Sequence, residues 1–148
     1  MSVNPYGNRS RVKEPEKKLV DSNVILRYLL ADEPRQHEKA SKFFEKVRVG
    51  SEKAVILESV LVECVYVLTK FYKVPRVETS ARLRELLRYR GIANADLEEL
   101  LEALSLFAEK SSLSIVDCIL HVKAKRSKSV VFTFDEALSD YSRRSTHF

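Results

Sequence analysis

Apolar positions along the chain follow two spacings, one typical of short buried strands and one typical of amphipathic helices. Continuous apolar runs rich in β-branched residues predict strands at 18–20, 53–57 and 129–134, and a further short strand before Asn94. Apolar positions three and four residues apart predict helices at 24–30, 34–50, 60–72, 77–89, 97–110, 115–126 and 136–139. Because strands alternate with helices, we expect an α/β domain with a central parallel sheet of about four or five strands, flanked by helices in a three-layer α/β/α arrangement.

The stretch before residue 18 is polar, and it contains Pro5, Gly7 and Pro15. We therefore expect a mobile basic leader over 1–17 and a single domain over 18–148. With 45% hydrophobic and 32% charged residues, the composition excludes a disordered or collagen-like chain. No apolar run is long enough to span a membrane and no apolar segment follows the first Met, so we expect a cytoplasmic protein without membrane contact.

The chain carries 26 Lys and Arg against 21 Asp and Glu, a formal net charge of +5. This basic excess is compatible with a polyanionic partner such as a nucleic acid. The two basic runs at 82–90 and 121–128 are interpreted as solvated helix faces, with contact to RNA as the alternative. Cys64 and Cys118 lie in apolar stretches without Cys-x-x-Cys spacing, which predicts two buried thiols.

Four acidic residues stand at positions that a parallel sheet would bring to one edge. Asp21 and Asp135 directly follow apolar strands, and the carboxyl ends of parallel strands are where ligands bind in open α/β sheets. Glu63 and Asp117 fall in the first turns of helices that begin at or face the same edge. Glu63 has apolar neighbours, and because burial of an unpaired carboxylate is costly, we expect it to be exposed or to have a partner. The spacing therefore predicts one acidic cleft.

Such a cleft favours a bound divalent cation. Two carboxylates 4 Å apart repel by about 4 kcal/mol at an effective dielectric constant of about 20, which proton uptake or a cation would relieve. Hard oxygen ligands without Cys or His favour Mg²⁺ or Mn²⁺. These ions can activate water for attack on a phosphodiester, and a positive rim would hold the polyanion.

Each acid also has a purely structural interpretation, which the sequence leaves open. Ser114 and Asp117 have the spacing of a helix capping box. Asp21 precedes a helix that it could cap, and Asp135 ends a strand where Asp commonly forms turns. The aromatic residues 66, 71 and 72 are interpreted as core or dimer contacts in preference to platforms for stacked bases.

Four stretches in this order resemble the PIN-domain ribonucleases, in particular the VapC-type toxins of toxin–antitoxin pairs: 20–30, 61–68, 114–120 and 131–135. The resemblance implies a PIN-like nuclease fold over the domain and an acidic quartet that binds Mg²⁺ or Mn²⁺. It assigns the quartet to Asp21, Glu63, Asp117 and Asp135, with Asn23 as a polar helper and Thr133 as a hydroxyl near the last acid. It also implies metal-dependent cleavage of RNA, a homodimer, and a cognate antitoxin protein whose chain covers the cleft.

Two hypotheses of function therefore stand. The first is a Mg²⁺- or Mn²⁺-dependent endoribonuclease that hydrolyses RNA phosphodiester bonds as the toxin of such a pair. The alternative is a catalytically silent PIN-like module that binds RNA or a protein partner. A phosphate-binding P-loop is excluded because the chain has no matching glycine-rich motif.

Overall fold

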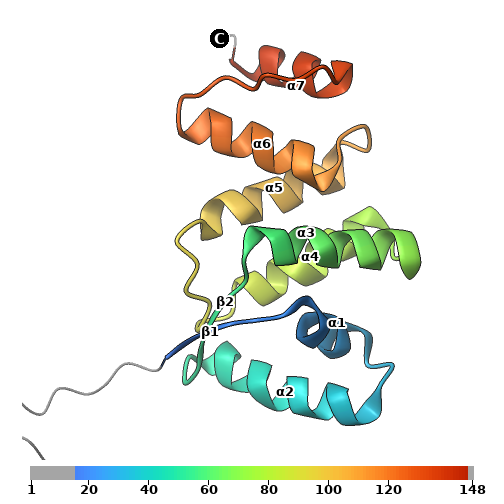
Figure 1. The fold of residues 1–148 in the computed structure, drawn as a ribbon, viewed down its shortest axis with the longest axis vertical. Coiled ribbons are helices and arrows are strands. Elements are labelled where there is room, and N and C mark those ends of the chain that lie inside the picture. Colours follow the sequence, from blue (N-terminus) through green and yellow to red (C-terminus); the bar gives the residue numbers. More distant parts are fainter. Residues whose placement is uncertain (1–15, 147–148) are drawn as a thin grey trace, which may run out of the picture.

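The computed structural model describes residues 16–146, and helices make up most of that part of the chain (Figure 1). The predicted leader over 1–17 lies outside the described residues as far as Pro15, whereas Lys17 already belongs to the first strand. Among the described residues, no helix has the length and apolar character needed to cross a membrane.

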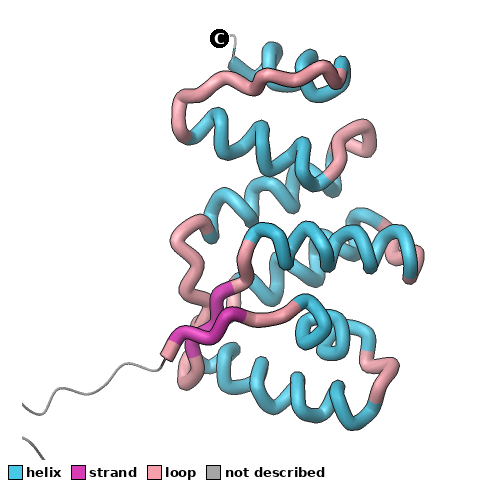
Figure 2. Tube along the Cα trace, viewed as in Figure 1, coloured by secondary structure: helices cyan, strands magenta, loops and turns pink. Residues whose placement is uncertain are grey.

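The sheet is small and parallel. Strands β1 (Lys17–Leu19) and β2 (Lys53–Val55) pair side by side, with Leu19 opposite Val55 (Figure 2). On the other edge of β2, Ala54 forms a single parallel bridge with Ile92. The predicted strand at 18–20 is therefore confirmed with a shift of one residue, and the one at 53–57 is confirmed in shortened form. The predicted strand before Asn94 is reduced to one bridge.

Helices form where the sequence periodicity predicts them, except that the last one, predicted over 136–139, continues to Thr146. They are α1 (Ser22–Leu30), α2 (Pro34–Val49), α3 (Glu58–Tyr66), α4 (Arg76–Leu87), α5 (Leu97–Glu109), α6 (Ile115–Arg126) and α7 (Glu136–Thr146). Helix α3 continues into a π-helical turn, η1 (Val67–Phe71). Helix α2 shows why the boundaries are readable from sequence: Pro34 begins it, and Gly50 ends it with a left-handed φ of 90°.

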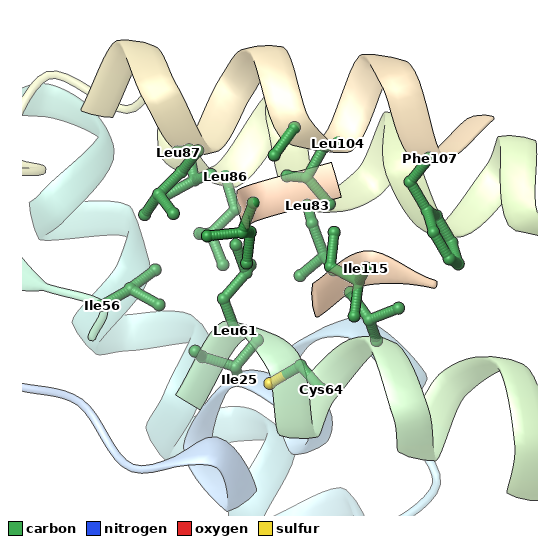
Figure 3. Close-up of a cluster of buried hydrophobic side chains, with 14 of the residues drawn as sticks. Ile25, Ile56, Leu61, Cys64, Leu83, Leu86, Leu87, Leu104, Phe107 and Ile115 are labelled. Carbon is green, nitrogen blue, oxygen red and sulfur yellow. The ribbon is translucent and has the colours of Figure 1, made fainter. Parts of the chain in front are cut away.

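The apolar core fills the space between the helices and one face of the small sheet. Figure 3 shows its centre, with the labelled side chains Ile25, Ile56, Leu61, Cys64, Leu83, Leu86, Leu87, Leu104, Phe107 and Ile115 converging from several elements. Burial of one such aliphatic or aromatic side chain stabilises the fold by about 1.5–3 kcal/mol. Because Ile25 and Leu61 belong to the same core, α1 and α3 are fixed against each other, and this packing positions the candidate site.

The number of strands was predicted wrongly. The α/β class is confirmed, but the described residues contain two strands and one bridge, not four or five strands. A short apolar run shows that a segment prefers burial or extended backbone. A strand forms there only where the edge of a second strand is available for hydrogen bonding.

The segment 129–134, the strongest strand prediction, is not a strand in this structure. It is an exposed connection between α6 and α7, with Val130, Phe132 and Phe134 91%, 89% and 92% exposed. The start of this segment is held by α6, because the Ser129 N–H donates to the Ala124 carbonyl. Helix α7 packs on α6 (Figure 1). The sheet lies away from α7, so the segment has no adjacent strand edge with which to pair.

Candidate functional site

Asp21 lies where β1 passes into α1. The Val20 N–H donates to the Val55 carbonyl at 3.1 Å, which continues the pairing with β2 up to this point. The Asp21 carbonyl accepts hydrogen bonds from Val24 and Ile25, so the residue occupies the N-cap position of α1. Its carboxylate makes no capping hydrogen bond and is exposed. The side chain therefore remains available for a ligand.

Glu63 faces the first turn of α1 from the neighbouring helix α3. The buried Ser22 hydroxyl donates to Glu63 Oε1 at 2.9 Å, while the Glu63 side chain as a whole is exposed. The sequence led us to expect exposure or a polar partner, and the structure provides both. Because Ser22 directly follows Asp21, this hydrogen bond joins the two acid-bearing elements.

The buried thiol of Cys64 lies near both Asp21 and Glu63. Burial, together with the negative charges of Glu63 and Asp21, raises the pKa of its thiol to about 12. The Sγ atom lies 3.9 Å from the Ser22 carbonyl oxygen, among the core side chains of Figure 3. Both carboxylates therefore act on one buried thiol. A neutral thiol is a poor nucleophile.

Asp117 forms the capping box that its spacing with Ser114 suggests. Its Oδ2 accepts the Ser114 backbone N–H at 3.0 Å, and the Ser114 hydroxyl accepts the Asp117 N–H at 3.1 Å. The structural role is therefore real. It engages one of the two carboxylate oxygens, so a second role for this half-buried residue stays a prediction.

Asp135 and Thr133 organise the start of α7. Asp135 Oδ1 accepts the Leu138 N–H at 2.9 Å, and the Thr133 hydroxyl accepts the Asp135 N–H at 3.0 Å. Helix α7 packs on α6, at the opposite end of the molecule from α2 (Figure 1). The carboxylate is exposed, but it serves as a helix cap in this arrangement.

A groove begins at Glu63 and runs between α1 and the helix formed by α3 and η1. We call it the α1–α3 groove; it has a volume of about 460 Å³. Asn23, the predicted polar helper beside Asp21, is exposed on its α1 wall. Arg27 lies on the same wall, one helical turn further along, and sequence reasoning missed it. Its spacing of four residues from Asn23 was the available signal, because such residues share one helix face.

The basic run at 121–128 is largely engaged in ion pairs. Lys123 Nζ lies 3.0 Å from Glu58 and 3.1 Å from Asp96, and Lys125 and Arg126 pair with Glu102. Three of the cations that the sequence suggested as a rim therefore hold α6 to its neighbours. This arrangement favours the structural interpretation of the run.

The structure brings Asp21 and Glu63 together and does not assemble the whole quartet. Among the described residues, no three His, Cys, Asp or Glu side chains form a group that could hold a metal ion. Mg²⁺ does not need such a cage, because it keeps several waters and commonly binds through one or two carboxylates and substrate phosphates. The two exposed carboxylates fit this donor set. Asp117 and Asp135 as further ligands stay a prediction.

Comparison with known proteins identifies the family of the chain. Residues 18–144 match the family model of the PIN domain. A curated protein of Aquifex aeolicus, named VapC ribonuclease, is 32% identical over 110 residues, which cover 74% of this chain and 79% of that protein. No solved structure gives a significant match. The match to the PIN-domain model spans most of the chain and includes all four predicted acids, and the chain belongs to the PIN-domain family.

Proposed function

We propose that this protein is a Mg²⁺- or Mn²⁺-dependent endoribonuclease that acts as the toxin of a toxin–antitoxin pair. The observation that carries the proposal is the junction of Asp21, Ser22 and Glu63 in a PIN domain, where the Ser22 hydroxyl donates to Glu63 and both acids are exposed. The name of the Aquifex aeolicus relative, VapC ribonuclease, supports the same reaction.

In this proposal Asp21 and Glu63 hold the cation, with Asp117 and Asp135 as additional oxygen ligands. The bound ion would polarise water and offset charge on the phosphate. Ser22 fixes the Glu63 carboxylate through its hydroxyl, so that less side-chain freedom is lost when a ligand binds. Asn23 offers an amide to the substrate, and Thr133 holds the backbone at Asp135. No side-chain nucleophile is required, because water is the attacking group.

The proposal includes the partners that the family resemblance implies. These are RNA as substrate, a cognate antitoxin protein that covers the cleft, and a second copy of this chain in a homodimer. An RNA-cleaving toxin meets its substrate in the cytoplasm, which is the location that we expect. The net charge of +5 supports attraction of RNA to the molecule.

A cleavage assay tests the proposed reaction. The full chain is incubated with RNA and Mn²⁺, with EDTA as the metal-free control. We expect Asp21→Asn and Glu63→Gln each to lower the rate of cleavage by at least about 100-fold, because each removes a charged ligand. Glu38→Gln is a matched control, since Glu38 is an exposed acid on α2 that pairs only with Lys42.

Two results would count against the proposal. If Asp21→Asn cleaved RNA as fast as the unchanged chain, the residual activity would belong to a contaminant or to another site. If the chain bound RNA but left it intact with Mn²⁺, the catalytically silent binding module would be the better description.

A further inference from the structure

The α1–α3 groove extends well beyond the acidic junction. Its α1 wall presents Asn23 and Arg27, which are four residues apart. The opposite wall presents positions 63, 66, 67 and 70, the spacing of a single helix face, and ends at Phe71. Eight residues of helix correspond to about 12 Å, so the groove leads from Glu63 along the surface far enough to hold part of a polymer chain.

Two aromatic rings in this groove are exposed. Tyr66 is 65% exposed and Phe71 is 75% exposed. For these two residues the core half of the interpretation is therefore wrong, and a dimer contact stays a prediction. Phe71 also packs edge-on against Tyr72, with ring centroids 5.0 Å apart, which holds its ring in place. The π-helical turn η1 begins directly after Tyr66 and ends with Phe71, and such turns are frequent at functional sites.

Two cations, Arg27 and Lys70, line the same groove. Arg27 Nε is the single buried side-chain nitrogen or oxygen without a partner among the described residues. The other end of this guanidinium lies 3.2 Å from Asp32 and 3.5 Å from the Tyr72 hydroxyl, which fixes its orientation. Lys70 is exposed on the facing wall. Cations beside exposed rings are suited to a ligand that is both aromatic and anionic.

We propose that the α1–α3 groove binds the nucleotide of single-stranded RNA next to the cleaved bond. Its base stacks on Tyr66 and Phe71, and its phosphate faces Arg27 and Lys70. The inference rests on the proposed function, which makes RNA the polymer and places the reacting phosphate at Asp21 and Glu63. Single-stranded RNA is the form that fits, because the faces of paired bases are already stacked within a duplex.

The absence of tryptophan from the sequence allows a direct test by fluorescence. Phe71→Trp places one tryptophan in the groove, and a short single-stranded RNA is titrated into this variant in EDTA, so that no metal-dependent cleavage takes place. We expect saturable quenching of the emission by stacked bases. Phe132→Trp is the matched control, because Phe132 is an exposed ring outside the groove, and its emission should change little.

Affinity measurements with a labelled RNA separate the two kinds of contact. Tyr66→Ala and Phe71→Ala should each weaken binding of single-stranded RNA about tenfold, because each removes a stacking surface. Lys70→Ala should reduce the slope of log affinity against log salt by about one, because one phosphate contact is lost. A duplex of the same length should bind more weakly and respond little to the aromatic substitutions.

The outcomes distinguish this inference from the proposed function. Cleavage of RNA without quenching of the tryptophan at position 71 would support the proposed function and would overturn the inference that the groove binds RNA. Quenching by an RNA that is not cleaved when Mn²⁺ is added would support RNA binding in the groove and would overturn the proposed nuclease function. Emission from position 71 that depends on protein concentration and not on RNA would show that a second copy covers the rings, which would overturn the inference.

Discussion

At the scale of single residues, the site depends on the hydrogen bond from the Ser22 hydroxyl to Glu63, which joins the element that carries Asp21 to the helix that carries Glu63. Ser22 Oγ donates to Glu63 Oε1, and its backbone carbonyl lies against the Cys64 thiol. The two hydrogen-bonded residues are 41 positions apart in sequence, so no local pattern could reveal the contact. The acids themselves were predictable, because their positions at strand and helix ends are local features.

Ser22→Ala tests the role of this hydrogen bond. Removal of the hydroxyl should lower the affinity for Mn²⁺ about tenfold, since the partners that orient a metal ligand typically contribute this much. The free energy of unfolding should fall by only about 1 kcal/mol, because the exposed Glu63 carboxylate regains water. Calorimetric titration and urea unfolding measure the two effects. Ser41→Ala, a matched substitution on α2, should leave the Mn²⁺ affinity unchanged.

Cys64 gives the fold a dependence on alkaline pH. Its pKa is raised from 9.0 to about 12, so in this window the folded state keeps a proton that the unfolded state loses. The contribution of this thiol to the free energy of unfolding is therefore fully present below pH 9. As the pH rises from 9 towards 12, the free energy of unfolding falls by up to about 1.4 kcal/mol per pH unit. Urea unfolding between pH 8 and 10 should show a shallower decline for Cys64→Ala than for the unchanged chain. Equal slopes would contradict the assignment.

At the scale of elements, helices were more predictable than strands. A helix closes its own hydrogen bonds, so the apolar spacing of 97–110 was enough to predict α5 to within a residue. A strand needs a partner from elsewhere in the chain, and the apolar run 129–134 has none in this structure. Asp117 shows the same limit, because one spacing fits both a capping box and a metal ligand.

Two substitutions in α6 separate these roles of Asp117. Ser114→Ala removes the hydroxyl that caps the helix, and it should lower the free energy of unfolding by about 1 kcal/mol while RNA cleavage persists. Asp117→Asn retains an acceptor for the Ser114 N–H but loses the charge, so cleavage should fall much further than stability. If both variants lost stability and cleavage in proportion, Asp117 would be a capping residue alone.

The exposed segment between α6 and α7 gives a clear prediction of stability. Phe132→Ser should change the free energy of unfolding by no more than about 0.5 kcal/mol, because its ring is already in water. Phe44→Ala, at a fully buried phenylalanine, should cost about 3–5 kcal/mol in the same urea titration. A loss of several kcal/mol at Phe132 would mean that the segment is buried in solution.

At the scale of the whole molecule, a helical body holds a small sheet whose ends meet α1 and α3. The α/β class and the order of the helices were predictable from the sequence, because each depends on local patterns. The size of the sheet was not, since it depends on whether the apolar run 129–134 meets the edge of another strand, and α7 packs on α6, away from the sheet (Figure 1). The site that follows is a pair of acids at one junction, with a groove beside it.

Titration of Mn²⁺ into the unchanged chain, Asp21→Asn, Glu63→Gln and the double variant tests this pair most directly. If the two carboxylates share one cation, the unchanged chain binds Mn²⁺, each single variant loses most of the affinity, and the double variant loses little more. Binding that survives both substitutions would contradict a metal centre at Asp21 and Glu63.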